Sequence, residues 1–99
     1  MMPSVSTKPT QQYPSFEVIA KVGGNLGDEA IRVCVYTFYK MHNGAAAYKN
    51  DKGYIVFYGG DLDGWQWVTG YNKWAGNGPL LSDVPDAQAF VRTMQFQVD

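Results

Sequence analysis

The side chains that most often do chemistry in proteins are few in this chain, and their spacing pairs none of them. The sequence has one cysteine, Cys34, and one histidine, His42, so these residue types cannot build a zinc site within the chain. Cys34 stands among valines and a tyrosine, which is typical of an inert thiol in a core strand. His42 precedes Asn43-Gly44, a pair typical of tight hairpin turns, and is predicted to be solvated.

Two further stretches resemble functional motifs only in part. Asp61-Leu62-Asp63-Gly64 resembles the start of a calcium loop, but the full pattern then requires a glycine and an acid where this chain has Gln66 and Asn72. A charged hairpin turn is therefore favoured. Ser82 and Asp83 lack the flanking glycines of a nucleophile elbow and are predicted to cap a helix. The sequence thus predicts a protein that is not an enzyme and has no catalytic residue, metal or cofactor.

A group of aromatic and amide side chains is the sharpest candidate for a binding site. Flat aromatic rings can cover the apolar faces of sugars, and amides or carboxylates can bind the hydroxyls. The candidate residues for a ligand or a partner are Trp65, Trp67, Tyr71, Asn72, Trp74 and Asn77. For Trp65 and Trp67 we favour packing in the core or a subunit interface, because so short a chain needs their area. Trp74, in a glycine-containing loop, is the better candidate for an exposed contact.

The charge balance argues against a nucleic-acid partner. Eight Lys and Arg are offset by nine Asp and Glu, and the formal net charge is −1. Residues 52–58 nevertheless resemble an RNA-recognition signature, because they combine lysine, glycine and aromatic side chains. Ile55 stands where that signature requires glycine or alanine. An RNA-binding domain is therefore a lesser alternative, and no nucleic acid is expected.

The order of β-branched and aromatic runs predicts an all-β fold. The runs are short and are separated by glycine, asparagine and aspartate, which are typical of tight turns. We predict a small antiparallel sheet or sandwich of five or six strands, with at most one short helix near residues 83–89. The strands are expected near residues 16–22, 31–39, 45–50, 53–59, 64–70 and 89–98. Residues 1–14 are predicted to be a flexible tail, which leaves residues 15–99 as one β domain.

Two of the expected strands have apolar residues on both faces. They are residues 31–39, expected to be central and covered on both sides, and Tyr54 to Tyr58. A chain of 99 residues can hardly cover both sides of a sheet by itself. A homodimer, or an aromatic surface that contacts another protein, is therefore expected.

The turn and strand pattern resembles the short β modules found in tandem in dinoflagellate and other algal proteins. The matching residues cover about a third of the chain and are Thr37 to Tyr39, Asn43-Gly44, Tyr48-Lys49, Tyr54 to Tyr58 and Trp65 to Val68. Three alanines stand where those modules usually have Pro-Val before the tyrosine. The resemblance implies a β fold and an interaction role, and it implies no defined active site.

The remaining expectations concern location and function. A single cysteine allows no disulfide within the chain, the N-terminal residues have no apolar signal-peptide core, and no run is long enough to cross a membrane. A cytoplasmic or organelle-interior location is expected. The leading function is a protein-interaction or structural module that works through an aromatic sheet surface, and a glycan-binding module is the alternative.

Overall fold

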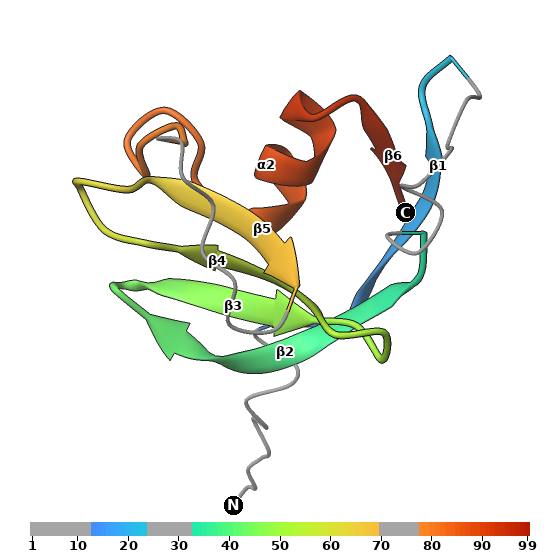
Figure 1. Ribbon diagram of the computed structural model, residues 1–99, viewed down its shortest axis with the longest axis horizontal. Helices are drawn as coiled ribbons and strands as arrows, with labels where there is room; N and C mark the ends of the chain where they lie inside the picture. Colours follow the sequence, from blue (N-terminus) through green and yellow to red (C-terminus); the bar gives the residue numbers. More distant parts are fainter. Residues whose placement is uncertain (1–12, 24–32, 70–77) are drawn as a thin grey trace, which may run out of the picture.

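The computed structural model describes residues 13–23, 33–69 and 78–99. Within them, six antiparallel strands form one sheet in the order β5-β4-β3-β2-β1-β6. The elements are β1 (Phe16–Lys21), β2 (Val35–His42), β3 (Ala45–Lys49), β4 (Tyr54–Tyr58), β5 (Trp65–Thr69), α2 (Ala87–Thr93) and β6 (Phe96–Val98). The sheet curls, and α2 lies against its inner side (Figure 1). A small all-β fold with a single short helix, as predicted, is confirmed for this part of the chain.

Tight turns fix the register of the central strands. Asn43 and Gly44 have φ angles of 52° and 86°, which are typical of a two-residue hairpin turn, and His42 pairs with Ala45 directly beside it. The Asn50 side chain then closes the β3–β4 turn, because its Oδ1 accepts from the Lys52 and Tyr54 amides at 2.9 Å each. The predicted hairpin turns therefore form where the asparagine residues stand.

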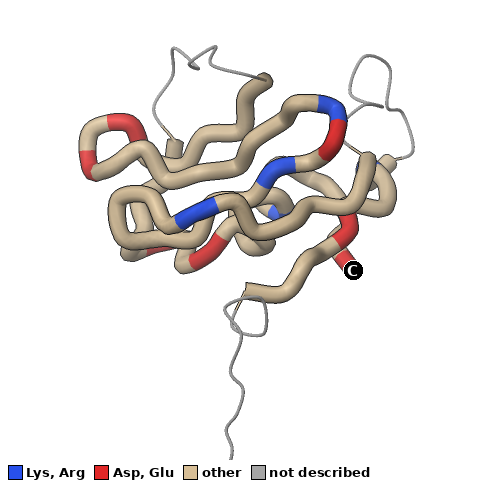
Figure 2. Tube along the Cα trace, turned by 90° about the horizontal axis from the view of Figure 1, so that it is seen from below, with Lys and Arg blue, Asp and Glu red and all other residues tan. Residues whose placement is uncertain are grey.

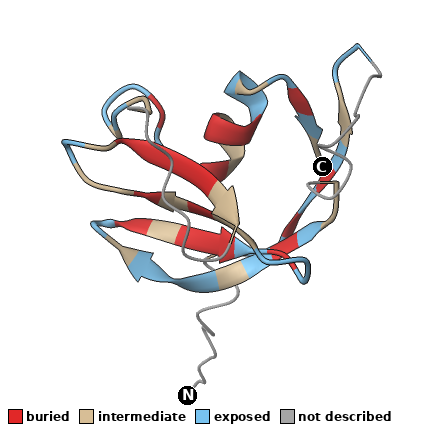
Figure 3. Cartoon of the chain, in the orientation of Figure 1, coloured by how far each residue is buried: buried red, intermediate tan, exposed pale blue. Residues whose placement is uncertain are grey.

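The core lies between the inner face of the sheet and α2. Its largest fully buried side chains include Trp65, Trp67, Tyr36 and Phe90, and Figure 3 shows buried segments side by side in β3, β4 and β5 and a buried segment in α2. The Trp65 and Phe90 rings stack with centroids 6.0 Å apart, and Trp67 meets Phe96 edge-on at 5.0 Å. The helix thus completes the core of the curled sheet.

The prediction of a strand over 89–98 is wrong. Ala87, Phe90 and Val91 are buried on one side of α2. Their spacing of three and four residues is that of a helix face, whereas the alternation of apolar residues from Phe90 onward equally fits a strand. The cap is Asp86, whose Oδ1 accepts from the Ala89 amide at 2.8 Å. The predicted helix near 83–89 is therefore displaced, and Gln95, with φ of 73°, turns the chain into the short strand β6.

The predicted strand 31–39 needs two corrections. Residues 31 and 32 lie outside the described part, and β2 runs from Val35 to His42 because pairing continues as far as the Asn43-Gly44 turn. The strand is central, as predicted, but it is not covered on both sides, since Val35 is 48% exposed. One face of β2 therefore lacks a covering layer within the described residues.

Of the predicted tail 1–14, residues 1–12 lie outside the described part. Tyr13 packs on the sheet, where its ring stacks on Phe38 with centroids 5.0 Å apart. Tyr13, which the prediction assigned to the tail, therefore contacts the sheet.

Candidate functional site

The residues predicted to bind a ligand or partner fall into two groups. Tyr71, Asn72, Trp74 and Asn77 lie outside the described residues. Trp65 and Trp67 are 0% and 2% exposed, so both rings belong to the core. Their N–H groups are satisfied there, because Trp65 Nε1 donates to the Val84 carbonyl oxygen at 2.7 Å and Trp67 Nε1 donates to the Tyr36 hydroxyl at 3.2 Å. Neither indole is available to a sugar.

His42 differs from the solvated turn residue that was predicted. Its Nδ1 lies 2.9 Å from the Tyr58 carbonyl oxygen, and its ring meets the Phe57 ring edge-on at 5.4 Å. Ala47 of the intervening strand is 1% exposed and has no bulk to keep these side chains apart. The small alanine run of β3 therefore lets His42 connect β2 to β4.

Cys34 also differs from the core strand residue that was predicted. It precedes β2 and is half-buried, and its Sγ donates to Asp51 Oδ1 at 3.2 Å. Lys52 Nζ in turn lies 3.8 Å from the sulfur. The thiol thus joins the start of β2 to the β3–β4 turn through polar contacts.

The face of the sheet opposite α2 carries an exposed group of side chains that we call the outer patch. It consists of Val35, Thr37, Tyr39, Lys40 and Lys49. Thr37 pairs with Lys49 across β2 and β3, and a bulge between Phe38 and Lys40 inserts Tyr39 as an extra residue. Tyr36 and Phe38 point to the core, so their neighbours Val35 and Thr37 lie on the outer face.

Two ammonium groups lie close to the Tyr39 ring. Lys49 Nζ lies 4.5 Å from the ring centroid and Lys40 Nζ lies 5.2 Å from it, both within the range of cation–π attraction. Tyr39 is 40% exposed and Val35 is 48% exposed. The outer patch is therefore apolar at its centre and positively charged beside it, and Figure 2 shows its basic segments on neighbouring strands.

A second exposed feature is the β4–β5 turn, which presents Asp61, Leu62 and Asp63 and which we call the acidic turn. Leu62 is 88% exposed, and the acidic segments of this turn lie at the left end of the molecule in Figure 2. The turn is firmly bonded, because the Gly59 amide donates to the Gly64 carbonyl at 2.8 Å and the Tyr58 hydroxyl donates to Asp61 Oδ1 at 3.2 Å. A leucine that is flanked in sequence by two aspartates is thus held in solvent.

Among residues 13–23, 33–69 and 78–99, no three His, Cys, Asp or Glu side chains gather closely enough to hold a metal ion. In the same residues, no helix is long and apolar enough to cross a membrane.

A comparison of the chain with known protein families, with curated proteins and with solved structures finds no match. The resemblance to the algal β modules therefore stays a prediction.

Tyr48 provides a test of the packing beneath the β2–β3 hairpin. Burial raises the pKa of its hydroxyl above 10.0, the hydrogen bond with Gln88 acts in the opposite direction, and the charge of Asp86 adds to the increase. Above the ordinary tyrosine pKa the unfolded chain loses this proton first, so the native state binds more protons and the free energy of unfolding falls as pH rises.

We expect this fall to be steeper in the wild type than in Tyr48→Phe between about pH 9 and about pH 11, measured by urea unfolding. The phenylalanine variant retains the other titrating groups and isolates this hydroxyl. Parallel pH profiles for the two proteins would contradict the prediction.

Sequence reasoning missed both exposed features. The outer patch depends on a bulge at Tyr39, and the alternation over 35–41 gives no sign of an extra residue there. The sequence predicts the acidic turn as a charged hairpin turn. A leucine between two aspartates in such a turn also indicates an exposed apolar side chain. That indication was missed because the stretch was compared only with a calcium loop.

Proposed function

We propose that this protein is a non-enzymatic, self-associating interaction module, in which the acidic turn of one copy docks on the outer patch of the next. The observation that carries the proposal is the exposure of apolar side chains on the outer face of β2, where Val35 and Tyr39 are 48% and 40% exposed. Exposed apolar side chains grouped on a sheet face are typical of contact surfaces, and tyrosine is enriched in them.

The charges favour this arrangement over a symmetric one. In a face-to-face homodimer, Lys40 and Lys49 of both copies would meet across one interface, and like charges would repel. A head-to-tail contact instead brings the lysines to the acidic turn of the second copy, where Asp61 is exposed. It also places an apolar side chain, Leu62, on the exposed Tyr39 ring.

Each feature alone would be ordinary. A single exposed leucine is common on protein surfaces and needs no explanation. The two features nevertheless match within one chain, because Leu62 is flanked in sequence by two aspartates and the Tyr39 ring has two ammonium groups nearby. A head-to-tail contact of this kind builds open chains unless its rotation closes a ring, which suits a structural module in a larger assembly.

Self-association should appear as an average molar mass that increases with protein concentration. We expect light scattering to show species larger than the monomer at about 0.1 mM and above, because a small interface of this type is weak. Tyr39→Ser and Leu62→Ser should each weaken the association at least about tenfold, since each removes the apolar centre of one surface. Salt at about 0.5 M should weaken it as well, by screening the charges.

The matched control is Leu80→Ser. Leu80 is 40% exposed, as Tyr39 is, but it belongs to neither surface. This variant should associate like the wild type. A monomer at every concentration, or an equal loss in all three variants, would contradict the proposal.

A further inference from the structure

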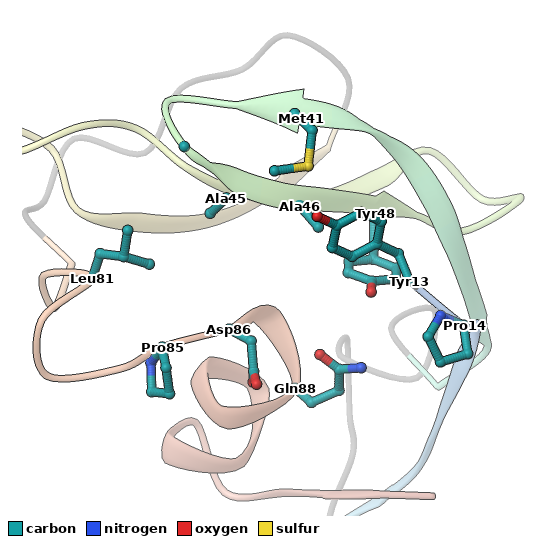
Figure 4. A pocket seen from close by; sticks show the side chains of 11 residues that line it. Tyr13, Pro14, Met41, Ala45, Ala46, Tyr48, Leu81, Pro85, Asp86 and Gln88 are labelled. Atoms are coloured by element: carbon teal, nitrogen blue, oxygen red, sulfur yellow. The ribbon is translucent and has the colours of Figure 1, made fainter. Parts of the chain in front are cut away.

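A pocket lies on the inner side of the molecule, between the β2–β3 hairpin and the segment that leads into α2. Its volume is about 400 Å³, within the range of small-molecule sites. Figure 4 shows side chains reaching it from the residues before β1, from the hairpin, and from residues 81–88. None of its lining residues belongs to the outer patch or to the acidic turn, so an inference about it does not depend on the proposed function.

The walls of the pocket are mostly apolar. Tyr13 and Tyr48 contribute aromatic rings, Met41 contributes a thioether, and Leu81 contributes an aliphatic side chain. Met41 is 48% exposed, which is unusual for a methionine on the inner face and leaves it accessible from this pocket. These groups suit a ligand with a compact apolar body.

One charged group lies among them. Asp86 is the only residue with a charged side chain among the described residues that line the pocket, and Gln88 is the nearby amide. The Asp86 Oδ1 accepts the capping bond from the Ala89 amide at 2.8 Å, which leaves the net charge of the carboxylate in place. The pocket therefore combines mostly apolar walls with one negative charge, which attracts cations and disfavours anions.

We infer that this pocket binds a small organic cation, an alkylammonium with an apolar body. The ammonium group lies by the Asp86 carboxylate, and the apolar body lies against Met41 and Leu81. A neutral molecule of the same shape gains the apolar contacts but not the attraction to the carboxylate. The difference between the two ligands therefore measures the contribution of the charge.

The test is a chemical-shift titration of the full chain with choline and with its uncharged carbon analogue, 3,3-dimethylbutan-1-ol. Choline is expected to give saturable shifts around the pocket with a midpoint on the order of 10 mM. The analogue should bind at least about fivefold more weakly. In Asp86→Asn, choline should bind no better than the analogue.

The variants are chosen so that loss of folding does not imitate loss of binding. Asparagine caps a helix about as well as aspartate, so Asp86→Asn should keep the Ala89 amide shift and the thermal midpoint. Asp83→Asn makes the same change of charge at an exposed residue outside the pocket lining, and it should leave choline binding unchanged. Equal binding of choline and its analogue, an equal loss in both variants, or the absence of saturable shifts would overturn the inference.

Discussion

Replacing Trp65 by alanine should lower the free energy of unfolding by about 3–5 kcal/mol. The ring is fully buried, it stacks on Phe90 of α2, and its Nε1 donates to the Val84 carbonyl oxygen at 2.7 Å. The substitution removes the contact between the sheet and the helix and also leaves a buried acceptor without its donor. Domains of this size have about 5–15 kcal/mol of stability in total, so a large unfolded fraction is expected.

Trp65→Phe is the matched control for this prediction. It keeps an aromatic ring against Phe90 but lacks the N–H group, so a smaller loss, about 1–3 kcal/mol, is expected. Urea unfolding followed by tryptophan fluorescence of the remaining residues measures both variants. A loss below about 1 kcal/mol in Trp65→Ala would show that α2 does not pack on this ring.

Replacing Gly64 by alanine should cost about 2–4 kcal/mol, far more than the same change at Gly53. Gly64 has φ of 71°, and a Cβ there would overlap the Gly78 carbonyl oxygen and come within 2.8 Å of the Pro79 carbonyl oxygen. The neighbouring backbone would have to move, although it is fixed by bonds such as that from Trp65 N to Pro79 O at 3.0 Å.

Gly53 separates the two causes of this loss. Its φ is 95°, but a Cβ there would meet no atom within 4 Å, so Gly53→Ala carries the backbone strain without the overlap. We expect about 1 kcal/mol for that variant. Equal losses at the two positions would contradict the close approach of residues 78 and 79 to the start of β5.

The fold was predictable where local chemistry and the hydrophobic pattern agree. Asn43-Gly44 and Asn50 mark turns by their backbone preferences, and the runs beside them form β3 and β4 close to the expected bounds. Residues 87–98 were not predictable by alternation, because Phe90 and Val91 fit a strand and a helix equally. The deciding contact, Trp65 against Phe90, joins residues far apart in sequence.

The surfaces were less predictable than the fold, again for a physical reason. The sequence indicated apolar groups on both faces of β2, but it did not show that Tyr39 lies in a bulge with the Lys40 and Lys49 ammonium groups near its ring. The pocket is lined by residues such as Met41 and Asp86, which come from segments far apart in the sequence. Neither arrangement has a local signature.

The central claim is that two different surfaces of this chain bind each other. Tyr39→Ser keeps the acidic turn and Leu62→Ser keeps the outer patch, so each variant alone should be largely monomeric. Sedimentation velocity of an equimolar mixture should show a dimer with one copy of each variant and no larger species, because the two remaining surfaces form a single contact. A mixture that stays monomeric, or Leu62→Ser alone associating as the wild type does, would contradict the claim.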